Sequence, residues 1–214
     1  MKKIVVPQDY LDYLNLNMDR AFFEELKTTF LQFGKDIKSI NDTTMIMRKS
    51  TDKDLNESVY KLLDKVDENK KCFIYDLLIL SNFPKKRIAE RLIEDIYSTY
   101  ENQDVVSFSE NSVWFFCDNL RELKQKLFFD EYVKILNIDQ LGTCRQPIVE
   151  LISYCKKHEA SDILLDHIDD EQINGHILDA LIKCNYKNIK EVASNFLNDE
   201  RDWVKSLAKK VINQ

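Results

Sequence analysis

Apolar residues recur every three or four positions along most of the chain, and this spacing predicts helices rather than strands. Between the stripes lie short polar stretches, which predict turns. The clearest stripes are Phe22, Leu26 and Phe30; Leu55, Val59, Leu62, Leu63 and Val66; and Ile88, Leu92, Ile96 and Tyr100.

Several residues indicate where these helices begin and end. Pro7 and Pro84 suit the first positions of helices, and Asp19 suits an N-cap. Gly34 suits the stop after the helix that Asp19 opens. Residues 36–50 have no clear period, so a strand, a loop and a weak helix all stay open for them.

The middle of the chain continues the helical pattern. Residues 72–80 predict a short buried helix, and residues 104–111 predict a loop that caps the next helix. Residues 114–136 predict two further helices with a break near residues 128–130. We therefore expect helix pairs joined by short turns.

An internal repeat marks the C-terminal third. The block at residues 148–152 is apolar-apolar-acidic-apolar-apolar, and it recurs 29 positions later at residues 177–181. Cys155 and Cys184 follow the two blocks at the same offset, and residues 207–211 repeat the apolar positions. The intervening helices are expected over residues 160–168 and 186–197, a rhythm typical of stacked helical repeats.

Residues 139–212 resemble HEAT or armadillo-type repeats, in which an acidic residue in a turn precedes a basic one by six positions. The matching pairs are Asp139/Arg145, Asp170/His176 and Asp199/Lys205. In that family such side chains form a structural ladder between neighbouring units. The resemblance implies an all-α fold, an α-solenoid of antiparallel helix pairs with about 10–12 helices. It implies a helical-repeat domain over residues 50–214, with residues 1–49 as an N-terminal helical cap.

Composition agrees with this fold. The 214 residues include only three glycines and three prolines, too few for sandwiches, barrels or glycine-rich phosphate loops. Gly175 is unexpected, because it falls inside a repeat helix, where glycine costs about 1 kcal/mol relative to alanine. The sequence offers no reason for it.

Charge and cysteine content narrow the class of partner. The net charge of −6 argues against a nucleic-acid-binding protein, because such binding depends on neutralising phosphates. Five cysteines without a Cys-x-x-Cys motif fit a reducing, cytoplasmic compartment. The apolar run after Met1 is too short for a secretion signal, and we expect no membrane span.

An acidic segment is the best candidate for a binding site. Residues 158–182 contain no Lys or Arg, so no basic neighbour in sequence offsets the acids there. A concentrated negative surface attracts a basic protein partner, although helix capping by Asp169 and Asp170 and simple solvation are the plainer interpretation. The candidate protein-binding residues are Glu159, Asp162, Asp166, Asp169, Asp170 and Glu171.

The residue patterns of metal sites and active sites are weak. His158, His167 and His176 are spaced by nine, which places successive residues on opposite faces of a helix. Cys155 and His158 lack an orienting third group at a loop. We therefore expect no metal site, no cofactor and no catalytic residue, with the cysteines in the core.

The function expected from these features is a non-catalytic protein-interaction module. A small acidic binder resembles, in type, bacterial immunity proteins that neutralise cationic toxins. The alternative is a nucleic-acid-binding repeat protein, since some HEAT-like proteins are alkylpurine DNA glycosylases with a basic, aromatic groove. The residues available for such a groove are Trp114, Phe115, Phe116, Trp203, Lys205, Lys209 and Lys210.

Overall fold

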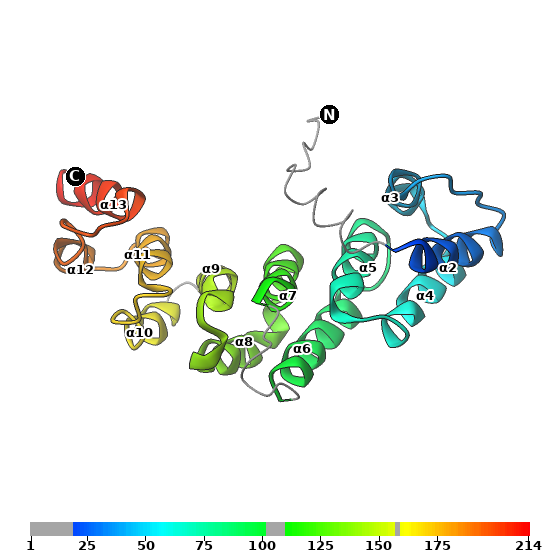
Figure 1. Ribbon diagram of the computed structural model, residues 1–214. Coiled ribbons are helices and arrows are strands. Elements are labelled where there is room, and N and C mark those ends of the chain that lie inside the picture. Colours follow the sequence, from blue (N-terminus) through cyan, green and yellow to red (C-terminus); the bar gives the residue numbers. More distant parts are fainter. Residues whose placement is uncertain (1–18, 102–109, 157–158) are drawn as a thin grey trace. The chain divides into compact units, whose positions relative to one another are not determined.

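A computed structural model describes residues 19–101, 110–156 and 159–214, and in these ranges every regular element is helical (Figure 1). The all-α class expected from the apolar spacing is thus confirmed. Within the same ranges, no helix has the length and apolar character needed to cross a membrane. The chain divides into two compact units, residues 1–88 and 89–214.

In its described residues, 19–88, the first unit contains four helices and the start of a fifth. α2 packs against α4, while α5 packs against both α3 and α4. Its elements are α2 (Arg20–Leu31), α3 (Ile40–Lys49), α4 (Lys53–Lys61), the 3-10 turn η1 (Leu62–Asp64), α5 (Glu68–Leu80) and the first residues of α6 (Lys85–Glu101).

The predicted ends of α2 are confirmed. The Asp19 carboxylate accepts a hydrogen bond from the backbone amide of Phe22 at 2.8 Å, which satisfies one of the free amides at the helix start. Gly34 follows the last turn with φ of +69°, a left-handed conformation that glycine adopts without strain. The stripe of Phe22, Leu26 and Phe30 is buried. The expectation for Pro7 lies outside the described residues.

The ambiguous segment 36–50 contains a helix, α3. Ser39 and Asp42 form a capping box, in which each side chain accepts a bond from the other residue's backbone amide. Thr43 and Met47, one turn apart, are fully buried. Capping and burial together outweigh the low helix propensity of the two threonines.

An ion pair and a cation–π contact join the first turn of α6 to α4. The Arg87 guanidinium donates two hydrogen bonds to the Glu57 carboxylate, at 2.7 and 3.1 Å. The same guanidinium lies 4.6 Å from the ring centroid of Tyr60, which stacks on Phe83. α6 itself confirms the helix predicted after Pro84, and Ile88 is buried.

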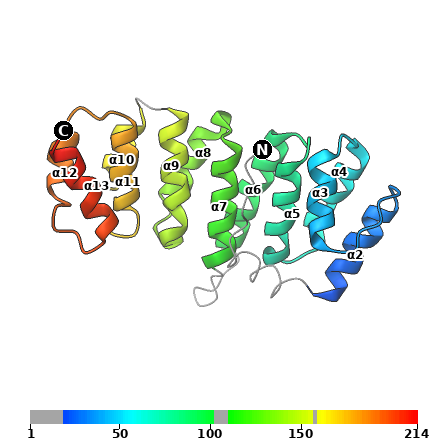
Figure 2. The same cartoon turned by 90° about the horizontal axis from the view of Figure 1, so that it is seen from above.

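The second unit continues from α6 with helices that pack on their neighbours in the chain. Figure 2 shows α7, α9 and α11 side by side, and α9 packs against α7, α8, α10 and α11. α13 packs against α11 and α12. Its further elements are α7 (Glu110–Leu123), η2 (Lys126–Phe128), α8 (Phe129–Leu136), η3 (Asp139–Arg145), α9 (Gln146–Cys155), α10 (Ala160–Leu165), α11 (Asn174–Lys183), α12 (Ile189–Ser194) and α13 (Asp202–Ile212).

Two intervening helices are shorter than the sequence predicts. α10 ends at Leu165 and α12 at Ser194, because the backbone then tightens into turns in which amides bond to carbonyls three residues back. The predicted break between α7 and α8 is present but spans residues 124–128, slightly before the expected position. The predicted loop at 104–111 falls mostly outside the described residues, and α7 begins at Glu110.

Gly175 has a clear structural reason. A Cβ atom built there would lie 2.7 Å from Cγ2 of Val204 and 2.8 Å from Cη2 of Trp203. Glycine therefore lets the first turn of α11 approach α13 closely, and this approach closes a core around Leu178, Val204 and Ala208.

The five cysteines are all buried and none of them forms a disulfide, as expected for core residues. The boundary expected between residues 49 and 50 lies inside the first unit, where α3 packs against α5. Separate roles for residues 1–49 and 50–214 stay a prediction.

Candidate functional site

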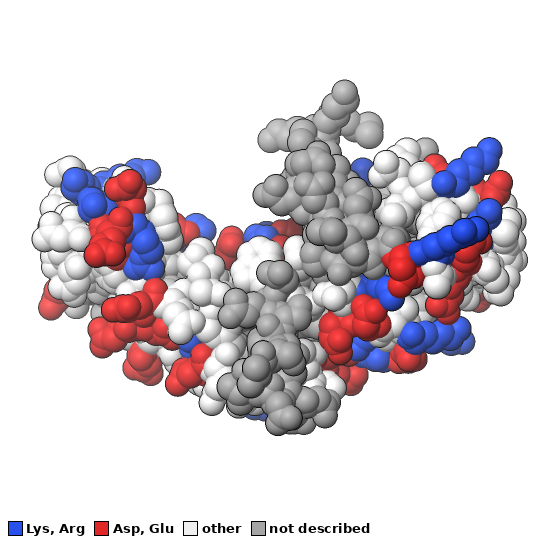
Figure 3. Space-filling view, viewed as in Figure 1, with Lys and Arg blue, Asp and Glu red and all other residues white. Residues whose placement is uncertain are grey.

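The acidic segment 159–171 spans α10 and the turn that leads into α11. Figure 3 shows Asp and Glu side chains gathered over this part of the second unit. Asp162 lies within α10, and Asp166 is its C-cap. Asp169 and Glu171 lie in the turn that follows.

Four of these acids have no ion-pair partner among the described residues. Asp162, Asp166, Asp169 and Glu171 are exposed, and no described Lys or Arg side chain forms an ion pair with any of them. Their negative charges therefore face solvent without an ion pair in the described part of the chain, and only Glu171 lies near enough to a cation, Arg201, to add to the rise in pKa that Asp199 causes there.

Glu159 differs from those four, because Lys156 Nζ lies 2.9 Å from its carboxylate. Both side chains are exposed, so this pair weakens the local charge but adds little stability. The expectation that no basic residue offsets the segment is wrong for Glu159.

Asp170 is not part of a free surface. Its Oδ2 accepts a hydrogen bond from Nη2 of Arg145, a side chain that is 1% exposed. Its Oδ1 accepts from the backbone amide of Gln172 at 3.0 Å, within the turn. Asp170 and Asp169 do not cap α11, since the N-cap residue is Ile173 and has no side-chain bond. Asp170 therefore holds the turn in place.

Arg145 links three segments through a buried guanidinium. Nη1 donates to the backbone carbonyl of Leu136 at 3.1 Å and to Oδ1 of Asp139 at 3.2 Å, and Nε donates to the carbonyl of Gly142 at 3.1 Å. The predicted pair Asp139/Arg145 is thus confirmed. The predicted partner of Asp170 is wrong, because Arg145 takes the place expected for His176.

Arg201 holds the same turn from α13's side. Nη1 donates to the carbonyl of Glu171 at 3.0 Å, and Nη2 donates to Oδ1 of Asn174 at 2.6 Å. Two further bonds, at 2.9 and 2.8 Å, join Nε and Nη2 to the Asp199 carboxylate. Hydrogen bonding to Arg201 lowers the pKa of Asp199. The predicted pair Asp199/Lys205 is therefore replaced by Asp199/Arg201.

Trp203 and His176 form an aromatic pair beside this turn. Their ring centroids are 5.2 Å apart, and the edge of the Trp203 ring lies against Gly175. Trp203 remains 47% exposed. Burial lowers the pKa of His176, so the imidazole favours its neutral form.

Charged side chains on α7, α9 and α11 neutralise one another. Nη2 of Arg121 lies 2.7 Å from Asp118, and Nη1 lies 3.5 Å from Glu150. Nζ of Lys183 lies 2.7 Å from Asp179 and 3.9 Å from the same Glu150. This row of paired charges contrasts with the carboxylates of the acidic segment that form no ion pair among the described residues.

A separate group of lysines surrounds an exposed tyrosine. Lys124 Nζ and Lys126 Nζ each lie 5.2 Å from the ring centroid of Tyr154, which is 47% exposed. Lys156 Nζ lies 4.5 Å from the ring centroid of Phe129. The second unit thus has a basic and aromatic area as well as an acidic one.

The described residues offer no arrangement that supports the metal or catalytic alternatives. In the described ranges, no three His, Cys, Asp or Glu residues are grouped as metal ligands, and His158 lies outside those ranges. His167 instead shares a hydrogen bond of 3.0 Å with the side chain of Asn137. Burial raises the pKa of Cys155, which disfavours a reactive thiolate.

Three of the residues considered for a nucleic-acid groove lie in α7 and are buried or half-buried. Phe116 is fully buried, while Trp114 and Phe115 are half-buried and contact each other edge-on at 5.6 Å. Lys205 lies 3.7 Å from the exposed Asp202. Trp203, Lys209 and Lys210 are exposed on α13, whereas the aromatic residues of α7 are at least partly buried.

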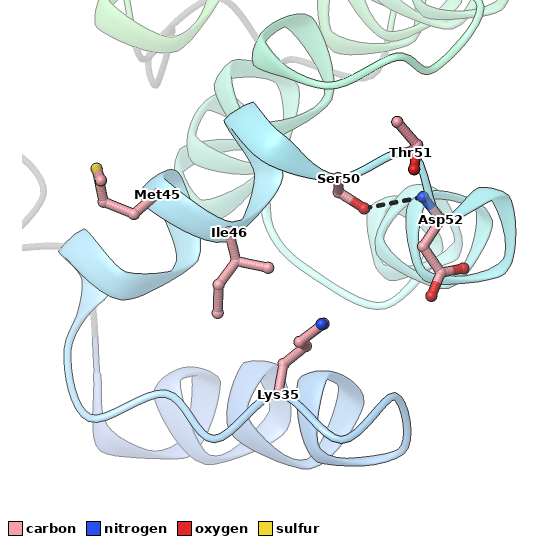
Figure 4. A pocket seen from close by; sticks show the side chains of 6 residues that line it. All are labelled: Lys35, Met45, Ile46, Ser50, Thr51 and Asp52. Atoms are coloured by element: carbon pink, nitrogen blue, oxygen red, sulfur yellow. Dashed lines mark hydrogen bonds between the residues drawn. The ribbon is translucent and has the colours of Figure 1, made fainter.

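A pocket in the first unit lies between α3 and its flanking loops. Its volume is about 380 Å³, and Figure 4 shows Ser50 accepting a hydrogen bond of 3.2 Å from the Asp52 amide at its rim. Lys35 and Asp52 are the only titratable residues in its lining, so the pocket does not suggest an active site. Its lining residues are Lys35, Met45, Ile46, Ser50, Thr51 and Asp52.

Sequence reasoning missed the role of Arg201. The only local signal is the Asp-x-Arg spacing of Asp199 and Arg201.

Comparisons of the chain with protein-family models, curated proteins and solved structures yield no match.

Proposed function

We propose that this protein is a non-catalytic protein-interaction module, of the immunity or inhibitor type, that binds a basic protein through the acidic segment of its second unit. The proposal rests on the exposed carboxylates of Asp162, Asp166, Asp169 and Glu171, with which no described Lys or Arg forms an ion pair. Like charges held together cost stability, and a basic partner relieves that repulsion. Asp170 supports the surface rather than contacting the partner, since it pairs with Arg145.

We further propose that the helices form a HEAT-like α-solenoid over residues 50–214. Two observations in the second unit support this proposal. α9 packs on α7, α11 packs on α9, and α13 packs on α11. Arg145 pairs with an acid in its own turn, Asp139, and with Asp170 in the next turn, as the family's ladder requires.

The decisive experiment measures association with a partner at several salt concentrations. Affinity capture with the tagged protein, followed by mass spectrometry, supplies candidate partners. Association rates are then compared for the wild type and for Asp162→Lys/Asp166→Lys. We expect the double variant to associate about ten-fold more slowly at low salt, with a smaller difference at high salt.

A matched control separates a local site from net charge. Glu24→Lys/Asp36→Lys changes net charge equally on exposed acids of the first unit. Equal slowing by both double variants would show that total charge alone matters and would contradict the proposed site. A partner without a basic surface would contradict it as well.

The enzyme alternative predicts base release from alkylated DNA. The present geometry favours it less, because the exposed ring of Trp203 lies on the helix that begins with exposed Asp202. DNA retention at low salt, followed by base release, would replace the interaction module with this alternative.

A further inference from the structure

Trp203 is an exposed aromatic residue in a fixed position. It lies in the first turn of α13, and 47% of its surface is exposed. The edge of its ring rests against Gly175, where a Cβ atom would lie only 2.8 and 2.9 Å from Cη2 and Cζ2. His176 lies beside the ring at a centroid distance of 5.2 Å. The ring is therefore supported by α11 while much of it stays open to solvent.

Such a residue suits the anchor of an interface. Tryptophan is enriched among residues that dominate binding energy, and a supported ring loses little conformational freedom on binding. A large exposed aromatic side chain at the second position of a helix does not stabilise that helix. Glycine at position 175 lowers helix propensity, but it leaves space for the Trp203 ring.

The charges around Trp203 favour a cationic group. Asp202 is 99% exposed at the side chain, and Glu200 is also exposed. The exposed Glu171 is tied to the same end of α13, because Arg201 donates a hydrogen bond to its backbone carbonyl. Arg201 is paired with Asp199 through two hydrogen bonds, and Lys205 lies 3.7 Å from Asp202.

We infer that Trp203 receives an arginine side chain of the basic partner, with the guanidinium on the exposed indole face and the nearby carboxylates around it. Tryptophan has the most favourable face for a cation, and guanidinium groups stack on it through a flat surface. This inference rests on the proposed function, since it names one contact within the binding of a basic protein.

The test uses a fluorescein-labelled hexaarginine peptide and the full chain at low salt. Fluorescence anisotropy gives the Kd, and Trp114→Phe makes Trp203 the sole tryptophan so that its emission reports contact with an unlabelled peptide. We expect saturable quenching of Trp203. Trp203→Ala should raise the Kd by about 3- to 30-fold, the range for a cation on an aromatic face. The Kd of Trp203→Phe should lie between those of the wild type and Trp203→Ala.

A second variant tests the seat of the ring. Gly175→Ala keeps the indole but moves it from its support, and we expect it also to weaken binding of hexaarginine. Circular dichroism and the urea midpoint establish that each variant is folded. Hexalysine serves as the comparison probe, and it should lose less affinity than hexaarginine when Trp203 is removed.

The outcomes separate this inference from the proposed function. An unchanged Kd for Trp203→Ala, with binding lost in Asp162→Lys/Asp166→Lys, overturns the role of Trp203 and leaves the acidic site intact. A Kd unchanged in all variants overturns both. If Trp203→Ala loses binding of hexaarginine and Asp162→Lys/Asp166→Lys does not, the arginine contact at Trp203 holds. The acidic segment is then not part of that binding site.

Discussion

Two arginines hold the turn at residues 170–174 from opposite sides, and they do so in different surroundings. Arg145 is 1% exposed at its side chain and bonds to Asp170, while Arg201 is 35% exposed and bonds to Glu171 and Asn174. Both satisfy backbone carbonyls as well as carboxylates.

The difference separates stability from recognition. Arg145 is buried and bonds to the carbonyls of Leu136 and Gly142 and to Asp170, so its loss leaves buried polar groups without partners. The region of Arg201 leaves Trp203 and several carboxylates open to solvent. One side of the turn is thus closed by packing, and the other side is exposed to solvent.

The largest effect should come from removing the buried arginine. Arg145→Met removes the donor to Oδ2 of Asp170 and to the Leu136 carbonyl, and we expect the free energy of unfolding to fall by about 3–5 kcal/mol. Urea unfolding followed by circular dichroism measures it. Asp139→Asn is the control, and it should cost less than about 1 kcal/mol because Asp139 is 83% exposed. Equal costs for both variants would refute a special role for the buried bonds.

The next effect concerns the contact between α11 and α13. Gly175→Ala places a methyl group against Trp203 and Val204, and we expect a loss of about 1–2 kcal/mol after the gain in helix propensity. Adding Trp203→Ala removes two of the three closest contacts, so the double variant should recover part of the loss. Strict additivity in this double-mutant cycle would count against a steric cause.

Removing the exposed arginine should cost less than removing the buried one. Arg201→Ala should lower the free energy of unfolding by about 1–2 kcal/mol, because water replaces part of its bonding. Arg201 also lowers the pKa of Asp199, a contribution that is present above the unfolded pKa and is lost as pH falls through the folded one. The variant should therefore lose less stability than the wild type on acidification to about pH 3.

The smallest effect is a titration next to Trp203. Burial lowers the pKa of His176, so the unfolded chain binds the proton more readily and stability falls as pH decreases below about 6.5. Trp203→Ala should expose the imidazole and raise its pKa toward the ordinary value. An NMR titration of His176 in both proteins measures this shift, and an unchanged pKa would show that Trp203 does not bury it.

Local signals in the sequence predict much of the fold. The Asp19 cap, the stripe of Phe22, Leu26 and Phe30, and the helix after Pro84 all depend on residues within a few positions of one another. Segment 36–50 stays ambiguous because a capping box and two buried side chains, rather than apolar spacing, form α3.

The candidate site is less accessible to sequence reasoning. Its charges are visible in the sequence, but which of them are free depends on residues far along the chain. Asp170 is neutralised by Arg145, 25 positions away, and Gly175 is explained by Trp203, 28 positions away. Spacing alone suggested His176 and Lys205 as partners, and packing selected two arginines instead.

The buried cysteines give the molecule a set of internal reporters. The five thiols lie in separate places: Cys72 in α5, Cys117 in α7, Cys144 in η3, Cys155 in α9 and Cys184 at the end of α11. A buried thiol reacts with an alkylating reagent only when its surroundings open. The labelling rate of each cysteine therefore records how often its own helix separates from its neighbours, without any introduced probe.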